Sequence, residues 1–439
     1  MEQIRRIKVA MICYFSNPKV REKLPLDDRK LYYILRKIMQ LPTKSIKYGD
    51  IAPWTTSTID CLSNRPDIEL CVITPHSGLK KRHVFFEDKK VKYHFVACDL
   101  GNFLGKIINN PRTWIKINPV GKIINSILNH YSPDIVVLIG AENAFYAHAV
   151  LSIKNYPVFV LCQTIYNNPE RTQYHAMAPK CAAVERMIFQ KESYFGVYSR
   201  MHYDLLRPLS PFAYIFKYGY PTKGLLLNPT PTDKEYDFVN FALTLDLRKG
   251  VHDSIKALSI VKQKYPNVKL NLVGVCNSDN QKELNELIHD LNLNENVIFT
   301  PFFEKQSDLF LHIQKSRFAV LPCKLDNISG TMTQSMQLGL PLVVYKTTGT
   351  PLLNREKECA LIAEKGNIEE LAKQMLTLMD CPEKAKMLAK NAREFQEKQV
   401  EYDRGNGDRL VANMRAVIAN YRNGAPIPQV QLFDLNRDE

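Results

Sequence analysis

The fold is decided by residues 317–353, RFAVLPCKLDNISGTMTQSMQLGLPLVVYKTTGTPLL. An apolar run ends there at a loop that contains Asp326, Ser329 and Gly330, and a helix-compatible segment follows. Pro341 then opens a second apolar run, LVVY. Strand, polar loop, short helix and strand form the unit that aims a helix N-terminus at a ligand beside a parallel sheet. Free backbone N–H groups and the helix dipole make this N-terminus an anion site, usually for phosphate.

Apolar runs alternate with helix-length segments through both halves of the chain, which predicts two parallel sheets. The runs are KVAMICYF, IELCVITP, YHFVAC, DIVVLIG and PVFVLCQ, then VNFALT, LNLVGV, VIFTPF, RFAVLP and LVVY. A Pro- and Gly-containing stretch, 208–224, is predicted to link two domains. We therefore expect an α/β chain with Rossmann-like domains over 1–215 and 216–405 facing each other across a cleft. A C-terminal helix or tail over 406–439 is expected to pack back on the first domain.

The positive charge of the chain is concentrated in its first half. Residues 1–220 carry 31 Lys and Arg against 17 Asp and Glu, whereas residues 221–439 carry 28 of each. This asymmetry indicates a polyanionic partner such as an anionic membrane surface or a lipid diphosphate. Solubility alone is the other interpretation. Nucleic acid ranks last, because no motif that reads DNA or RNA is present.

The cysteines and the apolar runs favour a cytoplasmic protein. Ten cysteines are scattered without CxxC pairs, which predicts buried free thiols rather than a zinc site or a disulfide framework. No signal peptide is evident at the N-terminus. No apolar run approaches the ~18–20 residues that span a bilayer. We expect a soluble protein, or one that lies peripherally on the inner face of the membrane.

A basic loop is predicted to share the sheet edge that carries Ser329. The segment LTLDLRKG leaves a strand before a helical pattern, which places Arg248 and Lys249 on the connecting loop. Two cations and helix N-terminal amides could neutralise a diphosphate leaving group without a metal ion. A solvated Arg–Lys pair is the alternative. Asp326 and Gln334 are about two helical turns apart, and a carboxylate with an amide suits the hydroxyls of a sugar.

At these residues the chain resembles the retaining GT-B glycosyltransferases of the large family 4, or "glycosyl transferases group 1", type. The resemblance is clearest over about residues 236–395, and the Glu-x7-Glu motif of the family falls on Asp326 and Gln334. The resemblance implies catalytic roles for Lys249, Arg248 and Asp326. It implies donor or phosphate binding by Ile328, Ser329, Gly330, Thr331, Gln334, Phe302 and Phe303. Thr244 stands where the family usually has an arginine, and Gln163 where it often has a histidine.

The acceptor is expected to bind the basic N-terminal domain. Polar residues that follow two of its strands are predicted to border the acceptor side: Glu142, Asn143, His148, Gln163 and Asn167. Segments 29–41 and 114–128 mix cations with apolar residues at near-helical spacing, which is typical of a helix in an anionic membrane interface. A helix that packs its apolar stripe against the sheet would show the same pattern.

The resemblance implies transfer of a hexosyl-type sugar from a nucleotide-diphosphate donor, with retention of anomeric configuration. It implies no cofactor and no metal ion. The acceptor would be a lipid-linked glycan or a polysaccharide, as in the synthesis of lipopolysaccharide or capsule. Two alternatives stay open: a nucleotide-sugar epimerase, which would act without an acceptor, and a non-catalytic protein that binds a nucleotide-sugar.

Overall fold

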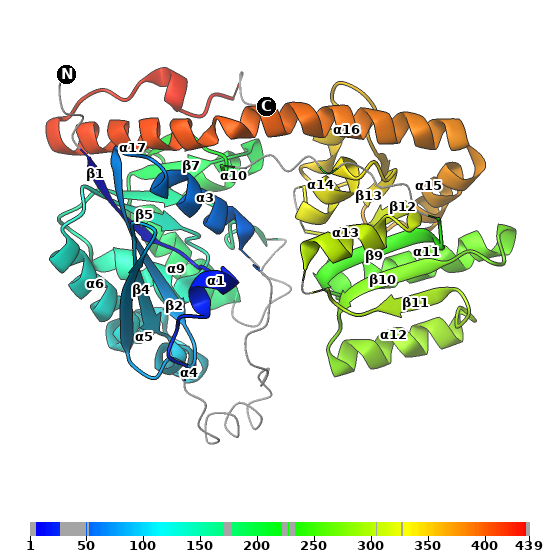
Figure 1. Cartoon of the computed structure of the whole chain (residues 1–439), viewed down its shortest axis with the longest axis horizontal. Helices are drawn as coiled ribbons and strands as arrows, with labels where there is room; N and C mark the ends of the chain where they lie inside the picture. Colours follow the sequence, from blue (N-terminus) through cyan, green and yellow to red (C-terminus); the bar gives the residue numbers. More distant parts are fainter. Residues whose placement is uncertain are drawn as a thin grey trace. The chain divides into compact units, whose positions relative to one another are not determined.

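The computed structural model divides the chain into two compact units (Figure 1). Unit 1 comprises Met1–Lys223 and Asp403–Glu439, and unit 2 comprises Gly224–Tyr402. The residues that the structure describes are 6–26, 50, 52–169, 178–221, 227, 233–303, 305–325 and 328–435. Asp326 and the segment 29–41, for which roles were predicted, lie outside these residues.

Unit 1 is built on an eight-stranded sheet with the order β3-β4-β2-β1-β5-β6-β7-β8. All neighbouring strands are parallel except β3, which is antiparallel to β4. The strands are β1 (Ile7–Ile12), β2 (Ile68–His76), β3 (His83–Asp88), β4 (Val91–Ala97), β5 (Ile135–Ile139), β6 (Val158–Leu161), β7 (Tyr194–Val197) and β8 (Tyr214–Lys217). Strands β5 and β6 are buried along their whole length, and β1 at every residue except Lys8, because helices cover both faces of a parallel sheet.

Two hydrophobic clusters form the core of unit 1, and each contains residues from one face of the strands. The helices are α1 (Pro18–Arg21), α3 (Pro53–Ser63), α4 (Asp99–Ile107), α5 (Pro111–Ile117), α6 (Pro119–Tyr131), α7 (Ala144–Ala147), α9 (Ala178–Lys191), α10 (Arg200–Leu206) and α17 (Asn406–Asn423), with 3₁₀ turns η1 (His148–Ser152) and η4 (Gln429–Gln431). Residues of α5, α6, α7 and α9 fill one cluster, and residues of α1, α3 and α17 fill the other.

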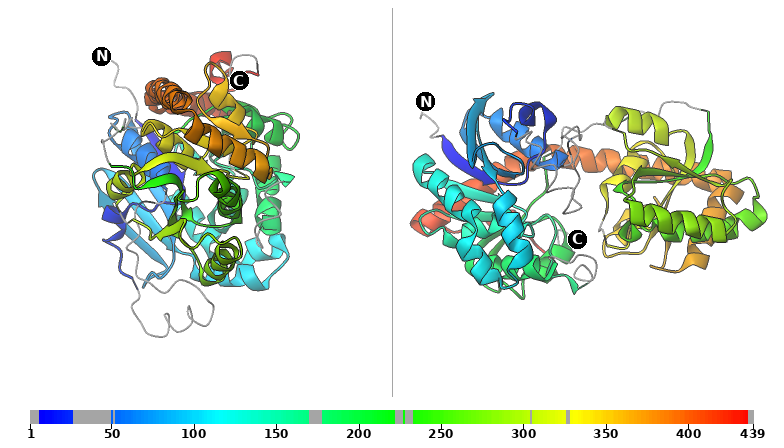
Figure 2. Two further views of the ribbon diagram at one scale, coloured as in Figure 1. Left: turned by 90° about the vertical axis from the view of Figure 1, so that its right-hand side faces the viewer. Right: turned by 90° about the horizontal axis from the view of Figure 1, so that it is seen from below.

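Unit 2 has a six-stranded parallel sheet with the order β11-β10-β9-β12-β13-β14. Its strands are β9 (Tyr236–Thr244), β10 (Leu270–Val275), β11 (Val297–Thr300), β12 (Ser316–Leu321), β13 (Leu342–Tyr345) and β14 (Leu361–Ala363). Its helices are η2 (Leu247–Lys249), α11 (Val251–Lys264), α12 (Ser278–Asp290), α13 (Gln306–Ile313), α14 (Gly330–Gln337), η3 (Thr350–Asn354), α15 (Ile368–Asp380) and α16 (Pro382–Arg404), which continues into unit 1. Helices lie on both faces of this sheet as well (Figure 2).

The prediction of two parallel-sheet, Rossmann-like domains is confirmed, although four strands were missed. Strands β7, β8 and β14 are only three or four residues long, and β3 alternates exposed and half-buried residues at the sheet edge. The interpretation of 208–224 as a linker was wrong over its middle, because β8 pairs there with β7. The expected boundary at residue 215 falls inside β8, and the units divide after Lys223.

The C-terminal helix α17 forms part of the core of unit 1. Leu410, Met414 and Val417 are buried in the same cluster as residues of β1 and β2. Asn413 donates from Nδ2 to the carbonyl of Lys217 at the end of β8, over 3.0 Å. The helix therefore covers part of one face of the sheet.

We predict that Met414→Ala lowers the free energy of unfolding by about 2–4 kcal/mol, because the truncation leaves a cavity in a packed core. Met387→Ala on α16 is the matched control, since the side chain of Met387 is 39% exposed and its loss should cost less than about 0.5 kcal/mol. Urea unfolding of both variants measures the difference. Equal destabilisation by the two changes would contradict the packing of α17.

Candidate functional site

Two loops meet at the carboxyl ends of the central strands of unit 2. One follows β9 and the other follows β12, and these strands are neighbours in the sheet. Strands β10 and β11 lie to one side of β9, whereas β12, β13 and β14 lie to the other. The strand order therefore reverses between β9 and β12, and in open α/β sheets ligands bind at such a switch point.

The basic loop after β9 is shaped by Asp246. This carboxylate accepts hydrogen bonds from the backbone N–H groups of Arg248 and Lys249, at 2.9 and 3.2 Å. It also pairs with the Arg248 guanidinium, with Nη2 2.5 Å from Oδ2. Part of the charge of Arg248 is thus balanced within the loop, which the sequence pattern did not reveal.

The basic loop is joined to the loop after β12. The backbone N–H of Lys324 donates to the carbonyl of Arg248 over 2.9 Å, and Lys249 donates from Nζ to Sγ of Cys323 over 3.5 Å. Gly250 has a φ of +68°, and a Cβ built on it would lie 2.1 Å from the carbonyl oxygen of Pro322. A side chain at this position would push the two loops apart, so a glycine is required here.

Helix α14 begins on the second of these loops. Ser329 caps it, accepting at Oγ from the backbone N–H of Met332 over 3.3 Å, and its Oγ lies 2.9 Å from Oγ1 of Thr331. Among the described residues, no atom lies within 4 Å of a Cβ built on Gly330, so a ligand can approach the first turn. Gln334 is half-buried in the next turn. Ile328 packs against the core cluster that contains β12 and α14. These residues share one sheet edge with Lys249.

Lys324 is a third cation at this edge that sequence reasoning missed. Its Nζ lies 2.9 Å from Oδ2 of Asp253, a buried carboxylate in the first turn of α11. The hydroxyl of Tyr345, at the end of β13, donates to the same oxygen over 2.9 Å. Asp253, in the VHD sequence at the start of α11, could have indicated this cation. An acidic residue that follows a basic loop is placed to pair with a lysine of the neighbouring loop.

Phe302 and Phe303 follow β11, two strands away from β9. The Phe303 ring packs 5.1 Å from the His312 ring of α13. His312 is anchored in turn by Asn271 of β10, whose Nδ2 lies 2.7 Å from Nε2. Burial lowers the pKa of His312, which favours the neutral ring in this contact. The structure does not bring the two phenylalanines into contact with Lys249.

In unit 1, three of the predicted acceptor residues gather around Gly140 at the end of β5. A Cβ built on Gly140, whose φ is +85°, would lie 2.6 Å from Nδ2 of Asn143 and 2.7 Å from Oε1 of Gln163. Asn143 donates from Nδ2 to Oε1 of Glu142 over 3.1 Å. Strand β5 neighbours β1, where the strand order of this sheet reverses. Glu142, Asn143 and Gln163 therefore occupy the switch point of unit 1.

The other two predicted acceptor residues lie elsewhere in unit 1. His148 is buried on η1 and packs against Trp114, with ring centroids 5.1 Å apart. Asn167 donates from Nδ2 to Oε2 of Glu185 over 2.7 Å, and Glu185 is fully buried on α9. This contact fixes the loop after β6 to α9, which is a structural role.

Sequence reasoning also missed Arg21 and His76 near the switch point of unit 1. Arg21 on α1 donates from Nε to Nε2 of His76 over 3.3 Å, and His76 is the last residue of β2. Burial, followed by the charge of Arg21, lowers the pKa of His76 to about 4. The imidazole is therefore neutral near pH 7 and can accept from the guanidinium. No motif marks this pair, because the two residues are 55 positions apart.

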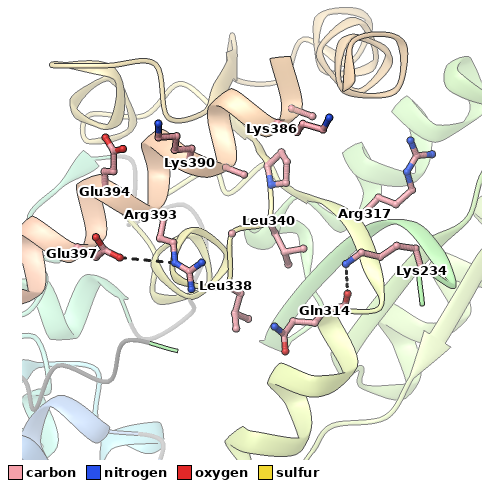
Figure 3. Close-up of a pocket in the computed structure, with 14 residues that line it drawn as sticks. Lys234, Gln314, Arg317, Leu338, Leu340, Lys386, Lys390, Arg393, Glu394 and Glu397 are labelled. Atoms are coloured by element: carbon pink, nitrogen blue, oxygen red, sulfur yellow. Dashed lines mark hydrogen bonds and ion pairs between the residues drawn. The ribbon is translucent and has the colours of Figure 1, made fainter. Parts of the chain in front are cut away.

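A separate hollow in unit 2 lies at the opposite edge of the sheet (Figure 3). It has a volume of about 770 Å³ and is bounded by Arg317 at the start of β12, the turn Leu338–Pro341 before β13, and Lys390 and Arg393 on α16. Arg317 is paired with Asp237 at 2.9 Å. Because it lies at the amino ends of β12 and β13, this hollow is distinct from the switch point beside Lys249.

Two negative findings apply to the described part of the chain. Within it, no group of three or more His, Cys, Asp or Glu side chains is placed to hold a metal ion. Of the helices in these same residues, none combines the length and the apolar character needed to cross a membrane.

Residues 226–395 match the family described as glycosyl transferases group 1. Over these residues, the chain is similar to the glycosyl transferases group 1. An uncharacterized glycosyltransferase of Haemophilus influenzae is 27% identical over 136 residues, which span 31% of this chain and 37% of that protein. The match therefore covers little more than a third of that relative.

Solved glycosyltransferase structures share the fold of the whole chain. Sucrose-phosphate synthase from Thermosynechococcus elongatus superimposes with a TM-score of 0.66 at 14% identity, over 94% of this chain and 100% of that one. HepE of Anabaena in complex with UDP-glucose superimposes with a TM-score of 0.62 at 15% identity. The match covers 93% of this chain and 100% of that one. At these identities the comparison establishes the fold, which is GT-B.

We predict that Gly250→Ala destabilises unit 2. Its Cβ would meet the Pro322 carbonyl at 2.1 Å, in addition to the ~1–2 kcal/mol cost of left-handed backbone. Gly366→Ala is the control, because Gly366 has a φ of +85° but no atom within 4 Å of its Cβ position. Thermal unfolding should show a larger loss for Gly250→Ala. Equal losses would contradict the tight contact between the loops.

Proposed function

We propose that the protein is a retaining glycosyltransferase that moves a hexosyl-type sugar from a nucleotide-diphosphate donor to a lipid-linked or polysaccharide acceptor. The observation that carries this proposal is the junction of two loops at the switch point of unit 2. There the Nζ of Lys249 lies 3.5 Å from Sγ of Cys323. Cys323 belongs to the loop that leads into the N-terminus of α14. A cation and a helix N-terminus on one sheet edge are suited to a diphosphate.

Chemically, the main demand is stabilisation of the negative charge that develops on the diphosphate as it leaves. Lys249 supplies a flexible ammonium group, and the amides of the first turn of α14 add the positive end of the helix dipole. Arg248 shares its charge with Asp246, so its main contribution is to hold the loop in place. Gln334, Ser329 and Thr331 offer groups that both donate and accept hydrogen bonds, as sugar hydroxyls require.

We predict that Lys249→Ala lowers kcat about a hundredfold, a loss of roughly 3 kcal/mol of transition-state stabilisation. Lys346→Ala is the control, because Lys346 is exposed after β13 and pairs with Glu364 at 2.7 Å. Release of nucleoside diphosphate is measured with UDP-, GDP- and ADP-sugars, with and without acceptor, and with EDTA present. Full turnover of Lys249→Ala at saturating donor would refute the role of Lys249, and turnover without acceptor would favour epimerisation.

We also propose that unit 1 docks on an anionic membrane through α4 and α5. Segment 114–128 was predicted to lie in a membrane interface, but its apolar residues Trp114, Ile124 and Leu128 are buried. Helix α4 instead exposes Leu100, Phe103 and Ile107, at 54%, 47% and 60%.

The opposite face of α4 consists of glycines that pack on α5. Trp114 donates from Nε1 to the carbonyl of Gly101 over 2.9 Å, and a Cβ on Gly105 would lie 3.2 Å from the same nitrogen. The large apolar residues of α4 therefore point outward, beside the exposed cations Lys106 and Lys116. An apolar face flanked by lysines is typical of an interfacial helix.

We predict that the double variant Phe103→Ser and Ile107→Ser reduces binding to vesicles containing anionic phospholipid at least tenfold. Phe212→Ser is the control, because Phe212 is 96% exposed outside α4 and α5. Binding of the unmodified protein should weaken as salt is raised, since screening reduces attraction to the charged surface. Equal binding to neutral vesicles, or no effect of the double variant in vesicle sedimentation, would contradict the proposal.

A further inference from the structure

An arginine with an incomplete set of partners lies at the switch point of unit 1. Arg21 is the last residue of α1, which follows β1, and its side chain is half-buried. Strand β1 pairs with β2 on one side and with β5 on the other, so the loop after β1 borders the point where the strand order reverses. In open α/β sheets, ligands bind at this point. Arg21 thus belongs to the loop after β1, whereas Glu142 and Asn143 belong to the loop after β5.

His76 holds the guanidinium of Arg21 by one of its edges. The Nδ1 of His76 lies 2.6 Å from the carbonyl oxygen of Ser77. A carbonyl only accepts, so Nδ1 carries the proton and Nε2 has a lone pair. Both Nε and Nη2 of Arg21 donate to this lone pair over 3.3 Å. His76 is 6% exposed, so packing fixes its ring, and the ring fixes the guanidinium. Of the five N–H groups of a guanidinium, three are left for other partners.

The charge of Arg21 forms no ion pair with an acidic side chain of the described residues. His76 is neutral near pH 7, so it orients the guanidinium without neutralising it. Asp50 acts on Arg21 through its charge, but its carboxylate is held elsewhere. It accepts from Oγ of Ser16 over 2.6 Å and from the backbone N–H of Ala52 over 3.1 Å. Burial lowers the pKa of Arg21, because a partly dry site disfavours its charge. An anion at the remaining N–H groups would offset this cost.

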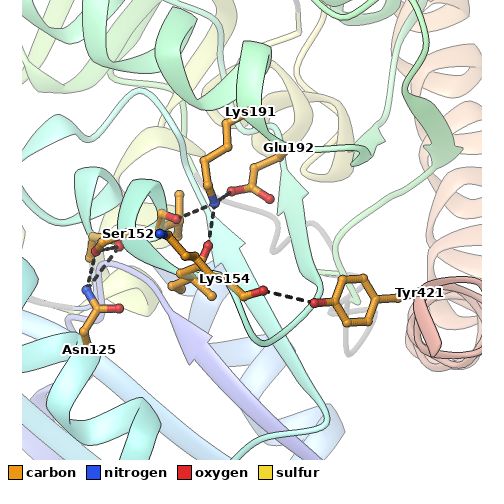
Figure 4. Close-up of polar contacts among 9 residues, drawn as sticks. Asn125, Ser152, Lys154, Lys191, Glu192 and Tyr421 are labelled. Carbon is orange, nitrogen blue, oxygen red and sulfur yellow. Dashed lines mark hydrogen bonds and ion pairs between the residues drawn. The ribbon is translucent and has the colours of Figure 1, made fainter.

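Arg21 differs from a cation that the fold itself satisfies. Lys191 at the end of α9 donates to the carbonyls of Val150 and Ile153 over 2.9 and 2.8 Å (Figure 4). It also pairs with Glu192 at 2.6 Å. By contrast, no nitrogen of Arg21 is among the described side-chain atoms that are both buried and without a partner, so its unbonded N–H groups reach solvent. A ligand can therefore contact the edge formed by Nη1 and Nη2. Such an edge binds an anion through two parallel hydrogen bonds.

The Arg21–His76 pair adjoins the start of α4, the helix that we propose to dock on a membrane. Strands β2 and β4 are paired up to their last residues. The N–H of Cys98, one residue before α4, donates to the carbonyl of His76 over 3.2 Å. The N–H of Gly78 donates to Oδ2 of Asp99, in the first turn of α4, over 2.8 Å. A lipid substrate that α4 meets at the membrane surface would therefore present its headgroup at this end of the sheet.

We propose that Arg21 binds the phosphate of a lipid acceptor that carries its sugar on a diphosphate. This inference rests on the proposed glycosyl transfer and names the class of its acceptor. Two N–H groups on the free edge of Arg21 match two oxygens of a phosphate, whereas a neutral glycan would leave the charge unpaired. A soluble sugar phosphate offers the same group without an apolar chain for α4, so we expect it to bind more weakly.

Binding of farnesyl diphosphate tests this proposal without any transfer of sugar, because the probe joins an apolar chain to a diphosphate. In isothermal titration calorimetry of the whole protein, we expect saturable binding of the probe below its micelle concentration. Farnesol and glucose 1-phosphate should bind at least about tenfold more weakly, since each lacks one part. Lys249→Ala should bind the probe as tightly as the unmodified protein. This result separates the site from a diphosphate bound at Lys249, so it stands apart from the test of transfer.

Variants of two neighbouring cations show whether Arg21 is the contact. Arg21→Gln should weaken binding of farnesyl diphosphate at least about tenfold, because a charge and a pair of hydrogen bonds are lost. Lys23→Gln is the matched control, since the side chain of Lys23 is 48% exposed and pairs with Asp88 at 2.9 Å; binding should change little. Arg21→Lys keeps the charge without the fork of donors, so its affinity should be intermediate. Thermal unfolding verifies the fold of each variant.

Three results would overturn the proposal. The first is an absence of binding, or equal weakening by Arg21→Gln and Lys23→Gln. The second is loss of binding in Lys249→Ala, which would place the probe at the switch point of unit 2. The third is tighter binding of glucose 1-phosphate than of farnesyl diphosphate, which would make the ligand a soluble sugar phosphate. Should Arg21→Gln fail to fold, unchanged affinity in a folded Arg21→Lys would also overturn it.

Discussion

The close approach of the two central loops is the constraint on which the switch point of unit 2 depends. Gly250 faces the carbonyl of Pro322 where a β-carbon has no room, and the N–H of Lys324 bonds to the carbonyl of Arg248. Parallel pairing of β9 with β12 brings the loops to one edge. The glycine then allows them to touch, so that Lys249 and the start of α14 lie at one edge of the sheet.

Glycines play a similar part in unit 1. Gly140 makes room for Glu142, Asn143 and Gln163 at the switch point, whereas Gly101 and Gly105 let α4 lie flat on Trp114. At each of these glycines, a neighbouring polar group or aromatic ring occupies the space that a side chain would otherwise fill. A glycine thus faces these polar and aromatic residues, and the absence of its side chain leaves the space that they occupy. Even a single added methyl group would be harmful at each place.

The long apolar runs predicted most of the fold, and local residue order predicted that Lys249 and Ser329 share one edge of the sheet. Both follow from short-range rules: a strand buried on both faces reads as an apolar run, and a loop that joins strand to helix must lie at the carboxyl edge. Short strands such as β8 carry too few residues to stand out. The pairs Lys324–Asp253 and Arg21–His76 form only because particular strands are neighbours in the sheets. The order of residues along the chain does not by itself reveal which strands are neighbours. His148 was placed at the acceptor edge for the same reason, and three-dimensional packing buries it against Trp114.

The path of the chain has a consequence for how the protein folds during synthesis. Unit 2 is one continuous segment, whereas unit 1 is completed by α17, which the ribosome makes after unit 2. Domains generally fold as units as they emerge. The surface of the first unit that receives Met414 therefore stays without its helix until all of unit 2 has been made. Unit 2 has all its own strands by then, so the half of the protein that is translated first is the one that matures last.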